Sequence, residues 1–207
     1  FEVLIINDFS TDNTLQKAKE LSEKNSNLKV INNKIKGLGG AINLGISESR
    51  GEYICIMMAD FSDSLDDMTR YFNLIKSKNL DAVFGSRFIK GSTLVNYPKK
   101  KLILNRIFNY IVKILFFSKY NDFTNAFKIY KASVIKSFLP FISESFNIFL
   151  EIPLKIISRN YSYEIIPISW KNRSIGEAKF NIKELRAKYI FTLIYCLIEK
   201  YLLKKKK

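Results

Sequence analysis

The sequence predicts an α/β fold with a mostly parallel sheet flanked by helices. Short apolar, β-branched runs alternate with stretches of helical period, and this order is typical of βαβ units. The runs lie at residues 2–6, 28–31, 53–58 and 81–85, and the helical stretches at 14–24, 38–49 and 66–76. Ligands of such sheets bind at the carboxyl ends of the strands. We therefore look for chemistry in the loops after Ile6, Ile31, Met58 and Gly85.

Composition limits the class of protein. The 207 residues suit one domain, and the 47% hydrophobic and 14% aromatic content excludes a disordered or fibrous chain. The net charge of +15 predicts an anionic partner, which could be nucleic acid, a phosphate-rich substrate or an acidic lipid surface. There is no histidine and only Cys55 and Cys196, so a His-based triad, a zinc site and a disulfide scaffold are poorly supported.

The C-terminal half predicts helices at 102–117, 146–158 and 182–203, with a strand at 163–168. In the first of these helices the polar residues cluster on one side and leave a broad apolar face; they are Asn105, Arg106, Asn109 and Lys113. Two interpretations remain for that face, which are packing in the core and insertion into the lipid interface.

The last helix predicts a membrane-facing segment. Its apolar run, 189–198, is shorter than the about 20 residues that a spanning helix needs. Because four lysines follow at Lys204–Lys207, the helix is a candidate peripheral anchor, and a solvated terminus is the alternative. We expect a domain at 1–181 and an amphipathic helix with a basic tail at 182–207. The start at Phe1, without Met or signal peptide, leads us to expect that the natural N-terminus is missing.

The first two strand-end loops carry features of a ligand site. Asp8 lies at the tip of a buried strand, where a carboxylate can accept hydrogen bonds from a nucleobase, whereas residues 10–12 also suit helix capping. The second loop, 36–41, places glycines at a helix start, where backbone amides favour anions. It lacks the endings of a P-loop or of a dinucleotide fingerprint, so an ATPase or NAD enzyme is not expected.

The third loop predicts a metal site. Asp60 and Asp63 follow the most apolar strand, and carboxylates suit Mg²⁺ or Mn²⁺ bridging a diphosphate. Capping of the next helix is the alternative for Asp63 and the preferred interpretation of Asp66.

Together these loops resemble motifs of family-two glycosyltransferases. Residues 7–12 resemble Asp-Asp-Gly-Ser-Thr-Asp, residues 37–41 resemble the nucleotide-facing turn, and residues 58–60 stand where the family places Asp-X-Asp. Three later segments are similar to the polyprenyl-phosphate (dolichol-phosphate) mannosyltransferase branch; they are 84–91, 121–128 and 167–179. The resemblance covers nearly the whole chain.

The resemblance implies a GT-A-type nucleotide-binding fold and inverting transfer of a hexose, mannose above others, from GDP-mannose to a polyprenyl or dolichyl monophosphate. It places the protein peripherally on the cytoplasmic face of a membrane. The implied nucleotide ligands are Asp8, Ser10, Lys36, Gly37, Gly39 and Asp60. Asp60 and Asp63 are the implied ligands of Mg²⁺ or Mn²⁺, and Asp60 and Arg87 the catalytic residues. The implied ligands of the acceptor phosphate are Arg87, Arg106, Lys128, Arg173 and Lys179.

Departures from the family pattern keep alternatives open. Met58 replaces the first carboxylate of Asp-X-Asp, Asn7 and Phe9 replace Asp and Gly, and the strand with a Pro-Xaa-Tyr/Phe-Asn-Glu-like motif is absent. One alternative is a transferase of the same family that uses glucose or an aminosugar. Another is a basic module with weakened catalysis that binds a membrane or nucleic acid. Nucleic acid is not expected as a partner, because the sequence lacks a recognisable reading helix or aromatic sheet motif.

Overall fold

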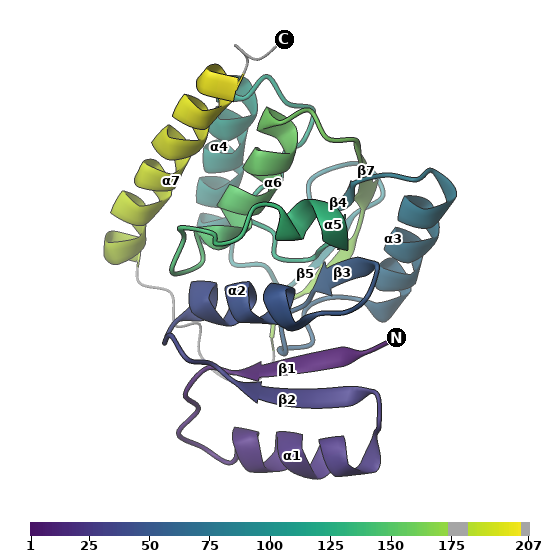
Figure 1. Ribbon diagram of the computed structural model, residues 1–207. Coiled ribbons are helices and arrows are strands. Elements are labelled where there is room, and N and C mark those ends of the chain that lie inside the picture. The colour runs from purple at the N-terminus through teal and green to yellow at the C-terminus, as the bar shows by residue number, and fades with distance from the viewer. Residues whose placement is uncertain (174–181, 204–207) are drawn as a thin grey trace.

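The computed structural model describes residues 1–173 and 182–203 (Figure 1). Its strands are β1 (Val3–Asn7), β2 (Leu28–Asn32), β3 (Tyr53–Ile56), β4 (Ala82–Ser86), β5 (Thr93–Val95), β6 (Lys128–Lys131), β7 (Tyr163–Pro167) and β8 (Ser169–Lys171). Its helices are α1 (Thr14–Lys24), α2 (Leu38–Glu48), α3 (Leu65–Ser77), α4 (Lys99–Leu115), α5 (Ala132–Lys136), α6 (Ile148–Ser158) and α7 (Ile182–Leu203). Every element expected from the sequence is present.

The strands form three sheets, which confirm the α/β class. The central sheet has the order β3-β6-β4-β7, and β4 pairs in parallel with β7 from Ala82 opposite Tyr163 to Ser86 opposite Pro167. β1 and β2 form a separate parallel pair, and so do β5 and β8. β6 runs antiparallel to both of its neighbours. The sequence analysis did not predict β5, β6 or β8, because strands of three or four residues carry too little periodicity to be distinguished from loops.

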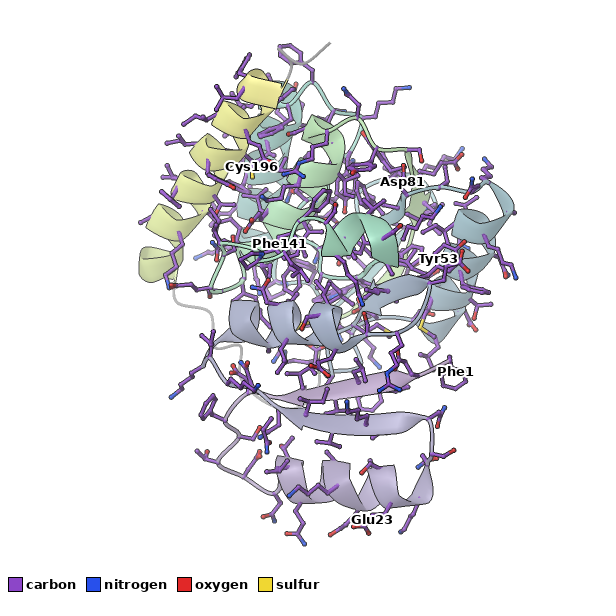
Figure 2. The ribbon with its side chains drawn as sticks, viewed as in Figure 1. Phe1, Glu23, Tyr53, Asp81, Phe141 and Cys196 are labelled. Carbon is purple, nitrogen blue, oxygen red and sulfur yellow. The ribbon has the colours of Figure 1, made fainter. Side chains whose placement is uncertain are left out.

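The core lies where α6 packs between the central sheet and α7. α6 is almost wholly buried, which brings the charged side chains of Glu151 and Lys155 into the interior. They are compensated there, since Lys155 Nζ lies 3.6 Å from Glu151 Oε1 and 3.3 Å from Glu199 Oε2 on α7. Buried charges require such partners. Cys196 of α7 also faces this core and is a free thiol (Figure 2).

The helices α4 and α7 bury some polar side chains beside apolar ones and leave many apolar side chains exposed. On α4, Asn109 is fully buried and donates to Asn105 Oδ1 and Thr124 Oγ1 at 2.5 and 3.2 Å, whereas its exposed side is aliphatic. The core-packing interpretation from the sequence holds for part of the apolar residues, because Val112 and Phe116 lie in the core and Phe108 packs against it. The predicted polar side is divided as well, since Asn109 is buried and Arg106 is exposed. No helix in the described part of the chain is long and apolar enough to span a membrane.

Candidate functional site

The candidate site is built from loops at the carboxyl ends of three strands. Asp8 follows β1, Asp60 and Asp63 follow β3, and Arg87 follows β4. Strands fix the start of each loop, so side chains distant in sequence are held at defined positions.

Asp8 connects the first loop to the glycine loop. Its Oδ1 accepts hydrogen bonds from the backbone N of Gly37 at 2.9 Å and from Asn33 Nδ2 at 2.8 Å. Gly37 has a φ of 125°, a conformation that side chains disfavour. The exposed side chains of Ser10 and Lys36 flank this junction in the sequence. The structure therefore brings together the first and second predicted nucleotide loops and gives Asp8 a role in shaping them.

Gly39 is required by a backbone contact within the protein. Its N donates to Glu144 O at 3.0 Å, and a Cβ added here would lie 1.9 Å from Ser143 O. The sequence analysis attributed the glycines to close approach of a ligand. At Gly39 the backbone of residues 143–144, and not a ligand, occupies the space beside the glycine. A backbone hydrogen bond thus attaches the glycine loop to a segment about a hundred residues away in the chain.

Replacing Gly39 with alanine is expected to lower the free energy of unfolding by about 1–3 kcal/mol, because the added methyl overlaps backbone that must move. Urea unfolding measures the change. Gly45→Ala in the same helix is the matched control, since its Cβ would meet Ile6 Cγ1 at 3.3 Å, a side-chain atom that can shift. We expect less than about 1 kcal/mol there, partly offset by helix propensity. Equal losses in the two variants would contradict the proposed cause.

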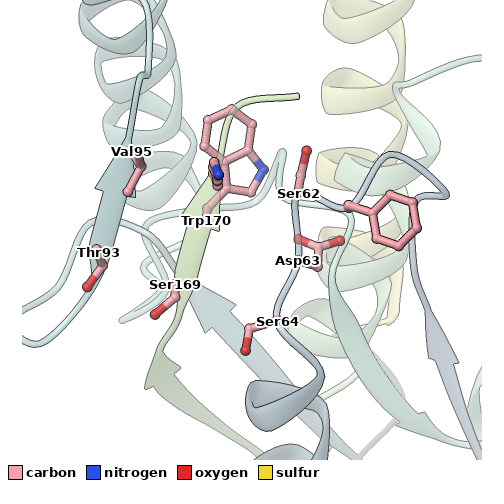
Figure 3. A pocket seen from close by; sticks show the side chains of 9 residues that line it. Ser62, Asp63, Ser64, Thr93, Val95, Ser169 and Trp170 are labelled. Atoms are coloured by element: carbon pink, nitrogen blue, oxygen red, sulfur yellow. The ribbon is translucent and has the colours of Figure 1, made fainter. Parts of the chain in front are cut away.

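The loop after β3 holds two neighbouring carboxylates. Asp60 Oδ1 accepts from Ser62 N at 3.1 Å, and Asp60 Oδ2 forms an ion pair with Arg173 Nη2 at 2.8 Å. Asp63 lies against Trp170 of β8 in the pocket shown in Figure 3. Burial raises the pKa of the Asp63 carboxyl to about 6, and the charge of Asp60 acts in the same direction. This loop therefore concentrates negative charge where a cation is favoured.

Acidification from about pH 7 to about pH 5 is expected to stabilise the fold through Asp63. The pKa of its carboxyl is about 6 in the folded chain and about 3.9 in the unfolded chain, so the folded state binds more protons between these values. Asp63→Asn removes the buried charge, so its stability advantage over the parent should be largest near neutral pH and shrink on acidification. Urea unfolding across pH measures this, with the exposed Asp66→Asn as control. An advantage that grows as the pH falls would refute it.

Arg87 is held by a buried ion pair. Its Nε donates to Asp122 Oδ2 at 2.8 Å and its Nη2 to Asp122 Oδ1 at 2.7 Å, and its backbone N donates to Oδ2 as well. The side chains of Arg87 and Asp122 are 7% and 0% exposed. The rings of Phe88, Tyr97 and Trp170 lie within 5.3–5.8 Å of the guanidinium carbon. A bidentate pair inside an aromatic enclosure fixes the orientation of Arg87.

The other cations predicted to bind an acceptor phosphate are placed differently. Arg106 is exposed on α4, with its guanidinium carbon 5.8 Å from the Phe88 ring, and so lies beside Arg87. Arg173 contacts Asp60, as described above. Lys128 is fully buried and its ammonium donates to the carbonyls of Phe123 and Asn125; burial lowers its pKa to about 7. It therefore does not reach the open side of the site. Lys179 lies outside the described residues.

A shallow pocket lies between α4 and Phe88, the residue that follows Arg87. It combines apolar and cationic side chains, and its lining is Phe88, Arg106, Ile107, Tyr110, Ile111, Lys113 and Asn121. Asn121 connects it to the sheet, because its Oδ1 accepts from Ser86 Oγ at 2.6 Å at the end of β4. Such a lining suits a ligand with an anionic head and an apolar body.

The motif spacing and this geometry agree with a comparison against protein families. The model of glycosyl transferase family 2 matches residues 1–139. The chain belongs to this family. A dolichol-phosphate mannosyltransferase of Pyrococcus furiosus is 30% identical over 106 residues, which cover 51% of this chain and 30% of that protein. A polyprenol monophosphomannose synthase of Mycolicibacterium smegmatis is 25% identical over 191 residues, covering 89% of this chain and 72% of that protein.

Solved structures support the fold. Glucosyl-3-phosphoglycerate synthase from Mycobacterium tuberculosis, in complex with phosphoglyceric acid, superposes with a TM-score of 0.66 at 13% identity, covering 95% of this chain and 69% of that one. Its complex with Mn²⁺, UDP-glucose and phosphoglyceric acid gives the same TM-score and identity, covering 94% and 68%. At this identity the likeness concerns the fold alone, and it agrees with the predicted α/β architecture.

The residues after β3 fit a divalent cation. Asp60 and Asp63 supply hard oxygen ligands. Ser62 Oγ is a buried side-chain oxygen for which the described residues offer no hydrogen-bond partner. No group of three or more His, Cys, Asp or Glu side chains within residues 1–173 and 182–203 is arranged to hold a metal. The set therefore suits an ion such as Mg²⁺, which takes its remaining ligands from a diphosphate and water. Met58 packs against the core and contributes no ligand.

Two residues of this family member's site were missed by the sequence analysis. Ser62 carries the unpartnered hydroxyl, and its only signal was its place two residues after Asp60. Asp122 holds Arg87, and its signal was stronger, because it is the only acidic residue between Ala82 and Ser143 in a stretch rich in lysine and arginine. A lone carboxylate among cations predicts an ion pair, but not which cation it binds.

Proposed function

We propose that this chain forms the catalytic part of an inverting glycosyltransferase that moves a hexose from a nucleotide-sugar donor to a lipid monophosphate. One arrangement carries the proposal. The charge of Arg87, which Asp122 fixes, acts on Asp63 in the carboxylate loop, and the next residue, Phe88, lines the half-apolar pocket on α4. A donor diphosphate with its cation matches the carboxylate loop. An acceptor with an anionic head and an apolar tail matches the half-apolar pocket.

In the proposed mechanism the protein positions two anions and neutralises them. The glycine loop, shaped by Asp8, faces the nucleotide, and Arg87 with Arg106 holds the acceptor phosphate. A bound Mg²⁺ or Mn²⁺ at Asp60 and Asp63 would supply charge neutralisation for the leaving diphosphate. The acceptor oxygen is already anionic, so it attacks the anomeric carbon without a general base. The bond from that carbon to the diphosphate oxygen breaks, the nucleoside diphosphate departs with the electron pair, and the configuration inverts.

The finer assignment is mannose from GDP-mannose, transferred to a polyprenyl monophosphate on the cytoplasmic face of a membrane to which the protein attaches peripherally. The names of the two curated relatives support this choice of sugar and acceptor. The outward apolar face of α4 supports a lipid acceptor, because the pocket opens beside it.

A second candidate within the family uses a different sugar. The structural neighbour crystallised with UDP-glucose and phosphoglyceric acid illustrates a UDP donor and a small phosphorylated acceptor. A third candidate is a module with weakened catalysis, for which Met58 in place of a carboxylate is the main argument.

A transfer assay separates the three candidates. The full-length protein is incubated in detergent with radiolabelled GDP-mannose or UDP-glucose, a short polyprenyl phosphate or phosphoglyceric acid, and either Mg²⁺ or EDTA. Metal-dependent mannosyl lipid is the expected product. If product forms only from UDP-glucose, the second candidate replaces the mannosyltransferase proposal. Nucleotide binding without product from either donor or acceptor would favour the third.

A further inference from the structure

An outward apolar face spans two adjacent helices. On α4 its members are between 47% and 62% exposed; they are Ile103, Leu104, Ile107, Tyr110, Ile111 and Ile114. On α7 its members are between 51% and 67% exposed; they are Ile190, Phe191, Ile194, Ile198, Tyr201 and Leu202. We name these twelve side chains the α4/α7 face. Contiguous exposed apolar surface of this kind marks an interaction site.

The two helices form one surface because they contact each other. The rings of Phe108 on α4 and Tyr189 on α7 lie 5.6 Å apart, and Lys200 Nζ donates to Phe116 O at 2.6 Å. Both helices lie on the same side of the molecule, away from α1 (Figure 1).

The inward sides of both helices carry buried polar side chains next to core residues such as Val112 and Cys196, whereas the outward sides are mostly apolar. Asn109 on α4 and Thr192 and Lys200 on α7 are buried and hydrogen-bonded; for example, Asn147 Nδ2 donates to Thr192 Oγ1 at 2.9 Å. A helix on a water-exposed surface normally presents its polar side outward. The outward sides of α4 and α7 instead present the twelve apolar side chains of the α4/α7 face, which suit apolar surroundings.

Charge identifies the occupant. From Lys99 to Asn121 the chain contains six lysines and arginines and no acidic residue. On α7 between residues 187 and 202 the single acid, Glu199, is turned inward to Lys155 and Arg159. On α4 an apolar stripe is thus bordered by cations, and that combination fits the interface of an anionic lipid bilayer. Two copies joined through this face would oppose stretches of like charge, which disfavours a dimer.

We infer that the α4/α7 face lies in the interface of an anionic membrane and that Lys99, Lys100 and the neighbouring cations contact the headgroups. The pocket beside Phe88 shares Ile107, Tyr110 and Ile111 with this face, so docking places the pocket at the level of the headgroups. The inference deepens the peripheral location in the proposed function by naming the surface and the lipid charge, and it is independent of which donor the protein uses.

Vesicle flotation tests the apolar part. The full-length protein is mixed with phosphatidylcholine vesicles with or without phosphatidylglycerol. We expect binding to the anionic vesicles, weakened about fivefold by Leu104→Ser and about twentyfold by Leu104→Ser with Ile194→Ser, because each loses buried apolar area. Leu21→Ser on α1 is the matched control, since Leu21 is 51% exposed and Leu104 61%. No binding, or equal loss in the control, would overturn the inference.

A second pair of variants tests the charge. Lys99→Gln with Lys100→Gln should weaken binding about thirtyfold, since each lysine near the headgroups contributes about 1 kcal/mol. Lys17→Gln with Lys19→Gln on α1 changes the net charge equally and should leave binding within about twofold. An equal effect of both pairs would mean that net charge alone attracts the protein, and the face would be rejected as the contact.

Two parallel measurements distinguish membrane docking from self-association and from the transfer reaction. Light scattering reports the oligomeric state. If the protein is a dimer and Leu104→Ser dissociates it, the α4/α7 face binds a second copy of the chain, and the inference of membrane docking would be rejected. Transfer to detergent-dispersed polyprenyl phosphate does not require vesicle docking. Loss of transfer with intact flotation would contradict the proposed function alone, whereas intact transfer without flotation would contradict the docking face alone.

Discussion

Replacing Asp122 with alanine is expected to lower the free energy of unfolding by about 3–5 kcal/mol, because it leaves the Arg87 guanidinium buried without its counter-charge. Arg87 donates three hydrogen bonds to this carboxylate. The carboxylate is fully buried, so water cannot replace it. Urea unfolding of the purified variant measures the loss, and a melting temperature lowered by several degrees should accompany it.

The exposed ion pair between Lys78 and Glu164 is the matched control for Asp122. Its side chains are 53% and 38% exposed, so Glu164→Ala should cost about 1 kcal/mol or less. A small loss in both variants would show that Arg87 finds another partner or water, and the fixed position of Arg87 in the proposed mechanism would have to be abandoned.

Replacing Asp60 with asparagine is expected to reduce glycosyl transfer by about 10²–10³-fold. The carboxylate would hold the cation that neutralises the departing diphosphate, and the loss of one such electrostatic contact has effects of this size. Residual activity should no longer respond to EDTA. Initial rates with and without Mg²⁺ measure both effects.

Two controls isolate the metal role of Asp60. Asp66→Asn, in the first turn of α3, changes an exposed carboxylate close by in the sequence and should leave the rate within about twofold. Arg173→Gln removes the ion pair with Asp60 but keeps the carboxylate, so EDTA sensitivity should persist. Full EDTA sensitivity in Asp60→Asn would place the metal elsewhere.

The site loops were predictable because strands and their ends are encoded locally. Buried strands are apolar runs, and a polar residue directly after such a run lies at the edge of a sheet. Asp8, Asp60, Asp63 and Arg87 all follow strands that the periodicity had located. The order of the motifs then led to the family, which the comparison confirmed.

Contacts between distant segments were not predictable in this way. Arg87 and Asp122 are 35 positions apart, and many lysines and arginines could have competed for the carboxylate. Gly39 looked like a ligand-contacting glycine until residues 143–144 were seen to occupy its open side. Lys128 belongs to a motif suited to phosphate, yet β6 directs it into the interior.

The sequence by itself determined the alternation of strands and helices, the strand-end loops and the two-sided character of α4, because each depends on neighbours along the chain. The tertiary structure decided which side of α4 faces outward, which carboxylate fixes Arg87 and which backbone Gly39 accommodates. Periodicity defines the two sides of a helix. Only packing against the rest of the chain selects the buried residues, and here Asn105, Asn109 and Thr124 bond to one another beside Val112 and Phe116, which leaves residues such as Leu104 and Ile107 exposed.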